Sequence, residues 1–213
     1  MKKRKERCDG RETREAILAS AVKEFAAKGY GLGSMRAICK NAHANSALAN
    51  RYFGSKENLY RTVAERLFGD LGAPMANLKA KVRDAKTWRA AVEEWVDDFL
   101  FMTIPTARAQ KLCAGLFRQE VVNPTRFHEE FQRRFGKPVY NSLSDLLAMA
   151  VKDEKELKLW CSFVWAQVTV YALADRSWHG NFRCGGADDE SWRDEVRRFV
   201  CRVIFRSLRY AGA

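Results

Sequence analysis

Apolar residues recur at intervals of three and four positions along almost the whole chain, which is the spacing of amphipathic α-helices. In the first third of the chain, this pattern predicts a helix over residues 11–28 that ends at Gly29, and a short helix after Ser34. A tight turn separates the latter from a second short helix over residues 45–52, and Ser55 is the predicted N-cap of a longer helix. We therefore expect a compact N-terminal unit of helices joined by short loops.

Beyond this unit, the predicted helices are longer and richer in aromatic residues. Their apolar positions fall at residues 88 to about 105, 112–121, 123–147, 154 to about 178 and 196–208. The third of these helices is expected to open at Asn123-Pro124, an N-cap followed by proline, and to kink at residues 136–138. The pattern predicts an all-α protein with two domains, residues 1–70 and 71–213.

The predicted helix over residues 154–178 is apolar nearly all round, and a helix without a polar face must be covered on both sides. The last helix adds an apolar stripe that includes Val196, Phe199 and Val200. One chain hardly offers enough surface to cover both helices, so we predict a homodimer formed by these last two helices. The alternative is a central helix that is covered within a single chain.

Positive charge is concentrated near the N-terminus. Residues 1–62 hold 14 basic and 6 acidic side chains, a net charge of +8, whereas residues 63–213 hold 24 and 20, a net charge of +4. A concentrated basic region suggests a polyanionic partner such as nucleic acid. Part of this charge is a basic arm at residues 2–11. The arm is either a solvated terminus or a second contact with DNA, along the minor groove or the phosphates.

Other residue classes argue against several functions. Six cysteines are scattered without a C-x-x-C pair and only three histidines occur, so we expect reduced thiols, no metal site and no cofactor. The sequence has no G-x-S-x-G motif and no phosphate-binding loop, and we expect that the protein is not an enzyme. It also has no apolar run long enough to span a membrane and no signal peptide pattern, which favours a cytoplasmic protein without a membrane partner.

The two short helices have the spacing of a helix-turn-helix, in which the second helix lays polar side chains against base edges in the major groove. Four polar residues are expected to face outward from this second helix: Asn45, Ser46, Asn50 and Arg51. Short amphipathic helices in helical bundles have a similar pattern. The spacing by itself therefore only suggests DNA binding.

The order of residues in this region is more specific. Three stretches resemble the TetR family of one-component transcriptional regulators: Thr13-Arg14-Glu15 through Gly29-Tyr30, then Ser34-Met35-Arg36-x-Ile38, then Asn50-x-Tyr52-Phe53-Gly54-Ser55-Lys56-Glu57-x-Leu59-Tyr60. The resemblance covers roughly residues 11–68. Two smaller segments, residues 45–50 and 118–124, are similar to the subgroup exemplified by the regulator CerR.

The resemblance implies roles in DNA binding for seven side chains. Ser34 and Arg36 would contact phosphates, and Arg36 would also lie near a base. Asn45 and Ser46 would read base edges or the adjoining backbone. Phosphate contacts are implied for three further residues: Asn50, Arg51 and Lys56.

The sequence departs from the family pattern at four positions. Gly33 stands where a threonine commonly caps the helix, and Arg51 replaces an aromatic residue or a histidine. His43 and Ala44 stand where the turn usually has glycine and valine, and a left-handed backbone there is costlier for histidine than for glycine. These differences concern the operator sequence that is read rather than the DNA-binding role.

Six large apolar residues of the C-terminal domain lie on inward stripes and could line an effector cavity: Trp95, Phe99, Met102, Phe117, Phe131 and Trp165. They can equally be ordinary core residues. We predict a ligand-responsive regulator, a repressor that binds a palindromic double-stranded DNA operator as a dimer and is released by a small hydrophobic or aromatic effector. The alternative is a constitutive DNA-binding or architectural protein without an effector.

Overall fold

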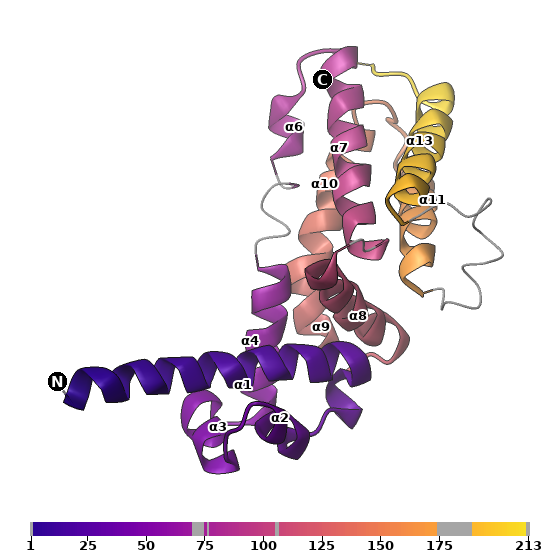
Figure 1. The fold of residues 1–213 in the computed structure, drawn as a ribbon. Helices are drawn as coiled ribbons and strands as arrows, with labels where there is room; N and C mark the ends of the chain where they lie inside the picture. Colours follow the sequence, from indigo (N-terminus) through magenta and orange to yellow (C-terminus); the bar gives the residue numbers. More distant parts are fainter. Residues whose placement is uncertain (1, 70–74, 76, 105–106, 174–188, 212–213) are drawn as a thin grey trace.

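The computed structural model describes residues 2–69, 75, 77–104, 107–173 and 189–211. These residues form helices in two groups and contain no β-strand (Figure 1). In chain order the helices are α1 (Lys2–Leu32), α2 (Met35–Asn41), α3 (Ser46–Phe53), α4 (Lys56–Phe68), α6 (Leu78–Lys81), α7 (Ala85–Thr103), α8 (Arg108–Val122), α9 (His128–Phe131), the π-helical turn η1 (Gln132–Gly136), α10 (Lys137–Leu147), α11 (Glu154–Leu173) and α13 (Asp189–Ser207). The prediction of an all-α protein is confirmed.

The lower group in Figure 1 consists of α1, α2 and α3, and α4 leads from it to the upper group. Its core forms where the apolar faces of these helices meet, around the fully buried side chains of Phe25, Ile38 and Leu59. Ser20 of α1 donates a hydrogen bond to the carbonyl oxygen of Ile38 at 2.9 Å. This bond and the shared core fix α2 against α1.

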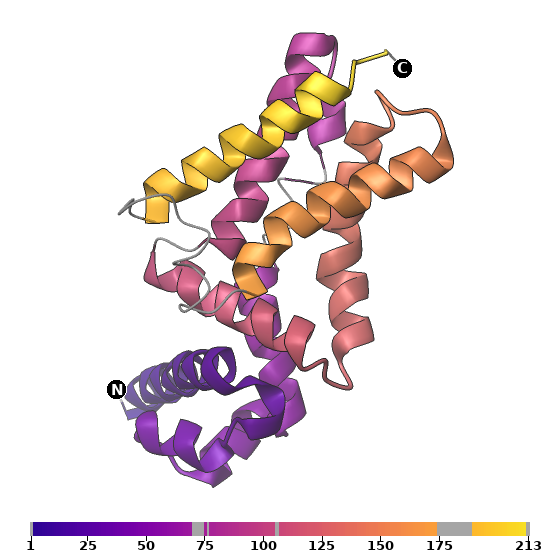
Figure 2. The same cartoon turned by 90° about the vertical axis from the view of Figure 1, so that its right-hand side faces the viewer.

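The upper group is built around α7, whose Trp88 and Trp95 are fully buried. Both indole N–H groups donate to carbonyl oxygens of α10, Trp88 to Leu146 at 2.8 Å and Trp95 to Val139 at 3.1 Å. The helices α11 and α13 lie together on one side of this group, toward the viewer in Figure 2. None of the described helices combines the length and apolar character needed to cross a membrane.

Between the two groups, α8 packs closely on α1. A Cβ atom added at Gly115 of α8 would lie 2.7 Å from the carbonyl oxygen of Ala26, so only glycine allows this approach. Gln119, one turn further along α8, donates to the carbonyl oxygen of Ala27 at 3.2 Å. The upper group is thus held directly against the first helix of the lower group.

The first helix is longer than the sequence pattern predicts. It begins at Lys2 rather than near residue 11, because residues 2–7 are lysine, arginine and glutamate, which favour helix. Gly29 adopts a left-handed backbone with φ 70° and interrupts the helix where the interruption was predicted. One further turn then follows to Leu32.

The prediction of a helix opening at Asn123-Pro124 is wrong. Asn123 instead ends α8, with its N–H donating to the carbonyl oxygen of Gln119 at 2.9 Å. The hydroxyl of Thr125 donates to the carboxylate of Glu120 at 3.0 Å, which holds the chain in a turn until α9 begins at His128. Side-chain bonds of this kind compete with a helical backbone.

A kink was predicted at residues 136–138, and the structure has the π-helical turn η1, which ends at Gly136. Pro138 follows in the first turn of α10 and has no N–H to donate to the preceding turn. Two other predictions concern positions outside the described residues: the domain boundary between residues 70 and 71, and the end of the helix expected at about residue 178.

Candidate nucleic-acid interface and apolar cavity

The α2–turn–α3 segment is shaped by two polar caps. The Ser34 hydroxyl accepts a hydrogen bond from the N–H of Ala37 at 3.3 Å, and the Asn45 Oδ1 atom accepts one from the N–H of Leu48 at 2.8 Å. Each bond satisfies a backbone donor that the first turn of a helix leaves unpaired. The turn between the caps includes His43 at φ 51°, the left-handed conformation expected at this turn position.

The inner face of this segment is buried and its outer face is open. Ile38, Cys39, Ala49 and Phe53 are buried in the lower core. Five of the seven predicted DNA-contacting residues are exposed: Arg36, Asn45, Ser46, Asn50 and Arg51. The capping bond of Asn45 uses its oxygen and leaves its amide N–H donors without a partner among the described residues.

The other two predicted residues make contacts within the chain. Ser34 caps α2 through its hydroxyl, and its N–H donates to the buried Glu24 carboxylate at 3.1 Å. The Lys56 ammonium lies 4.6 Å from the centre of the Tyr30 ring and 3.4 Å from the Gly31 carbonyl oxygen. Burial lowers the pKa of Lys56, while the Glu24 carboxylate opposes that shift. Both residues therefore already help to hold α1, α2 and α4 together.

Gly33 has a structural explanation. A Cβ atom at this position would lie 2.6 Å from a ring carbon of Phe25 and 2.8 Å from the Gly29 carbonyl oxygen. The residue is buried directly before the Ser34 cap. A threonine at position 33 would collide with the core. At the start of α2, Ser34 is therefore the residue that can cap the helix and contact a phosphate.

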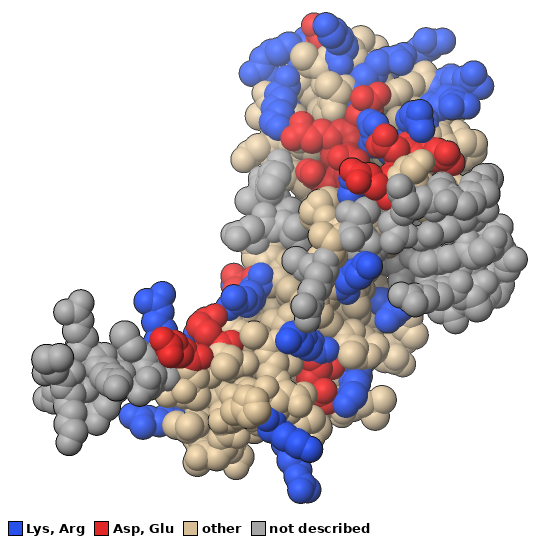
Figure 3. Space-filling view, viewed as in Figure 1, with Lys and Arg blue, Asp and Glu red and all other residues tan. Residues whose placement is uncertain are grey.

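The charge around the outer face has one sign. Between Glu24 and Glu57 the chain has no acidic residue and five basic ones: Lys28, Arg36, Lys40, Arg51 and Lys56. In Figure 3 the largest group of acidic side chains lies on the upper part of the molecule and smaller ones lie on the lower group, whereas the lowest surface shows Lys and Arg among uncharged side chains. A basic face without carboxylates attracts a polyanion.

An apolar cavity lies between α4, α7, α8, α9, η1, α10 and α11. Its lining consists of Phe68, Phe99, Met102, Phe117, Phe131, Phe135, Gly136, Val139 and Trp165. The lining contains no ionisable side chain, and the open space is small, about 30 Å³. Its aromatic rings touch one another, as in the edge-to-face pair of Phe99 and Trp165 with centroids 4.9 Å apart.

Five of the six predicted cavity residues line this space, and Trp95 does not. Trp95 is fully buried beside it, stacks on Phe99 with centroids 5.3 Å apart, and bonds to α10. The sequence interpretation missed four lining residues: Phe68, Phe135, Gly136 and Val139. Phe135 could have been found, because it continues the four-residue spacing of Phe127 and Phe131.

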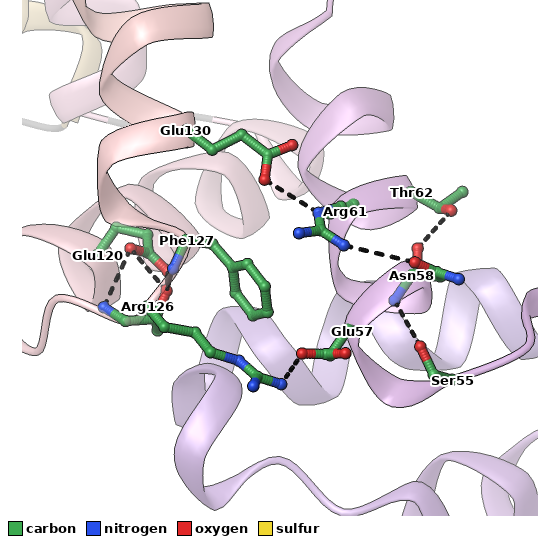
Figure 4. A network of polar contacts seen from close by, with 10 residues as sticks. Ser55, Glu57, Asn58, Arg61, Thr62, Glu120, Arg126, Phe127 and Glu130 are labelled. Atoms are coloured by element: carbon green, nitrogen blue, oxygen red, sulfur yellow. Dashed lines mark hydrogen bonds and ion pairs between the residues drawn. The ribbon is translucent and has the colours of Figure 1, made fainter.

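Near the cavity, the buried carboxylate of Glu120 joins the two groups of helices. The hydroxyl of Tyr60 in α4 donates to it, and so do the hydroxyl and the N–H of Thr125. Burial raises the pKa of Tyr60, and the bond to Glu120 raises it further. The phenol therefore stays protonated at neutral pH and can donate. Figure 4 shows Glu120 next to the Arg126-Phe127 turn that lies against α4.

The four cysteines whose side chains the structure describes offer no reactive group to these sites. Cys39, Cys113, Cys161 and Cys201 are buried and unbridged. Burial is the main cause that raises the pKa of Cys113 and Cys201 to about 12. These thiols stay protonated at neutral pH and act as small apolar groups, which agrees with the prediction of reduced structural thiols.

Residues 17–63 match the family model described as bacterial regulatory proteins, tetR family. A stretch of 72 residues is 35% identical to the HTH-type transcriptional repressor NicS of Pseudomonas putida and covers 34% of each chain. The chain thus matches about a third of the length of this curated relative. Residues 17–63, which hold the helix-turn-helix, are therefore similar to the TetR family. The finer similarity to the CerR subgroup stays a prediction.

Solved structures share the fold over most of the chain. A transcriptional regulator from Rhodococcus sp. Rha1 is 16% identical with a TM-score of 0.66, covering 92% of this chain and 97% of that one. The regulator FadR from Bacillus subtilis, in complex with stearoyl-CoA, is 14% identical with a TM-score of 0.63, covering 88% and 97%. At these identities the likeness concerns the fold alone.

Proposed function

We propose that the protein is a ligand-responsive transcriptional repressor. It binds a palindromic DNA operator as a homodimer and is released by a small apolar or aromatic effector. The DNA-binding part is carried by one observation: α2 and α3 bury one face in the lower core and expose a face that bears Arg36, Asn50 and Arg51 and no acidic residue. The 35% identity to the repressor NicS over 72 residues supports the role of repressor.

The homodimer is supported by apolar side chains that the single chain leaves exposed. On α11, Leu159 is 70% exposed and Phe163 and Val170 are partly exposed, and on α13 Phe199 is 58% exposed. Phe199 was predicted on the same apolar stripe as the buried Val196 and Val200, and a second copy of the chain would cover it. Two recognition helices in such a dimer would enter successive major grooves about 34–36 Å apart.

The effector class follows from the cavity. An apolar lining without ionisable groups accepts an acyl chain or an aromatic compound, and FadR, which shares the fold, is described with stearoyl-CoA bound. Ligand pockets typically measure about 300–1,000 Å³. Binding therefore requires ring movements in the present cavity of about 30 Å³. An effector that favours the opened state by about 1.4 kcal/mol lowers DNA affinity tenfold.

The DNA-binding proposal is tested with DNA fragments selected by the protein from a random pool. Arg51→Ala should weaken binding to all fragments and reduce the slope of log affinity against log salt by about 0.9 for each phosphate that the variant no longer neutralises. Lys86→Ala, an exposed lysine of α7, is the matched control and should leave the slope unchanged. An unchanged slope in Arg51→Ala would contradict the proposed interface.

The competing function is a constitutive DNA-binding protein without an effector, and the small volume of the cavity favours it. The two functions differ in their response to a library of apolar compounds. Release of bound DNA together with a rise in Tm supports the regulator. Complete insensitivity across the library supports the constitutive protein.

A further inference from the structure

Three ion pairs join α4 to the segment of residues 126–134, which contains α9 and the start of η1. They are Glu57–Arg126, Arg61–Glu130 with Nε and Oε2 3.0 Å apart, and Glu65–Arg134 with Nη2 and Oε2 2.6 Å apart. Figure 4 shows the first two pairs from close by. We call these six side chains the charge ladder.

The charge ladder has a regular order. Its members recur at every fourth residue on both sides, run in the same chain direction, and alternate in sign along each side. A slide of α4 by one helical turn would therefore oppose Glu57 to Glu130 and Arg61 to Arg134. A slide in the opposite direction would bring like charges together as well. Because like charges repel, the charge ladder is attractive in one register only.

An aromatic ring reinforces this register. Phe127 lies between two rungs, with the guanidinium carbon of Arg61 4.7 Å and that of Arg126 5.1 Å from the ring centre. The same ring packs edge-to-face on Tyr30 at 5.1 Å. Cations at the face of a ring are attracted to it. The start of the segment is thus attached both to α4 and to the end of α1.

The other end of the charge ladder reaches the apolar cavity. Phe68, in the last turn of α4, lies edge-to-face on Phe131 with centroids 5.0 Å apart and contacts Phe135 at 5.6 Å. All three rings line the cavity. The segment that carries one side of the charge ladder therefore also carries Phe131 and leads directly into Phe135, two of the rings that a ligand would have to displace.

At its first turn, α4 is connected to the recognition helix. Only Gly54 and Ser55 separate the end of α3 from the start of α4, and Ser55 caps α4 by accepting from the N–H of Asn58 at 3.2 Å. Phe53 of α3 and Leu59 of α4 are both buried in the lower core. A displacement of α4 as a body therefore displaces α3.

We infer that the charge ladder makes α4 and residues 126–134 move as one body. When Phe131 and Phe135 are displaced, α4 then tilts instead of sliding along its own axis. This tilt of α4 displaces α3. The inference rests on the proposed function, since it assigns the route between the effector cavity and the DNA-binding face. The six members are positioning residues, because none lines the cavity and none belongs to α2 or α3.

Amide hydrogen exchange of the full chain without DNA gives the first test. Glu130→Arg turns attraction at the middle rung into repulsion. Peptides covering residues 56–68 and 126–136 should exchange about 2- to 10-fold faster in this variant. The double variant Arg61→Glu/Glu130→Arg restores opposite charges and should return both peptides toward the parent rates. Unchanged exchange in Glu130→Arg, or no recovery in the double variant, would overturn the inference.

A matched control tests whether the loss of any surface ion pair has the same effect on exchange as a change in the charge ladder. Glu94→Arg breaks the Lys81–Glu94 pair, which is 2.7 Å long, similarly exposed, and joins α6 to α7 within the upper group. It should leave the exchange of residues 56–68 and 126–136 at the parent rates. Equal acceleration in Glu94→Arg and Glu130→Arg would mean that the charge ladder has no special part.

The second test uses DNA, because coupling between two sites is reciprocal. Saturating the parent with fragments that it selects from a random pool should change the exchange of residues 128–136. Glu130→Arg should still bind these fragments within about threefold of the parent affinity, since one exposed ion pair contributes little. In this variant, however, DNA should no longer change the exchange of residues 128–136. The double variant should regain the change. A parent that binds no DNA contradicts the proposed function. DNA binding without a response in the parent, or with an unchanged response in Glu130→Arg, contradicts the inference.

Discussion

At the residue scale, Glu120 is the most constrained charge in the described part of the chain. Its side chain is buried, and its oxygens accept from Tyr60 of α4 and from Thr125 of the turn before α9. A buried carboxylate is expensive unless donors surround it. The contact explains why residues 123–127 form a turn at this place, and it joins the two groups of helices by hydrogen bonds instead of apolar contacts alone.

Tyr60→Phe should lower the free energy of unfolding by about 1–3 kcal/mol, because it leaves a buried acceptor, the side chain of Glu120, without one of its donors. Urea unfolding followed by circular dichroism measures this change. Tyr52→Phe is the control, since the hydroxyl of this half-buried tyrosine has no hydrogen bond among the described residues. If Tyr60→Phe lowered the free energy of unfolding no more than Tyr52→Phe does, the hydrogen bond from Tyr60 to Glu120 would not stabilise the fold.

At the element scale, α3 shows how one side chain can serve two purposes. The side-chain oxygen of Asn45 caps α3, and its amide N–H donors suggest a second role in the proposed contact with DNA. The cap at Ser55 was predicted from the sequence, because a cap depends on residues three positions apart. Ser34 and Asn45 were predicted only as the positions where α2 and α3 begin. The contacts of Lys56 with Tyr30 and Gly31 were not predicted, since they depend on how α1 ends.

Two substitutions separate the uses of Asn45. Asn45→Asp retains a good N-cap, so the free energy of unfolding should stay within about 0.5 kcal/mol of the parent, whereas Asn45→Ala should lose about 0.5–2 kcal/mol. Both variants lose the amide donors and should change the sequences selected from a random DNA pool. Parent-like selection by Asn45→Asp would limit Asn45 to its capping role.

At the scale of the whole molecule, polar and apolar surfaces are distributed unevenly. The acid-free face of α2 and α3 lies at one end, and the exposed apolar side chains of α11 and α13 lie on the upper group. Exposed apolar patches of this kind mark association surfaces. The proposed dimer would cover the patch and place two DNA-binding faces on one assembly.

Leu159→Glu combined with Phe199→Glu should shift the protein from dimer to monomer at micromolar concentration, because the charges would have to be buried in the proposed interface. Size-exclusion chromatography with light scattering measures the mass. Leu32→Glu replaces an equally open leucine, 80% exposed at the end of α1, and should leave the dimer intact. A parent that is a strict monomer would refute the dimer.

Most of the helices, the cap at Ser55, the helix-turn-helix and the apolar character of the C-terminal residues could be predicted from the amino-acid sequence. These features depend on interactions between residues three or four positions apart, which a periodic pattern records. Three other features became visible only in the folded chain: Phe68 lines the cavity, Trp95 packs behind it, and Phe199 stays exposed. The same holds for Arg61 and Glu130, which are 69 residues apart in the chain. Their pairing depends on how α4 packs against α9 and η1, and no local pattern contains that information.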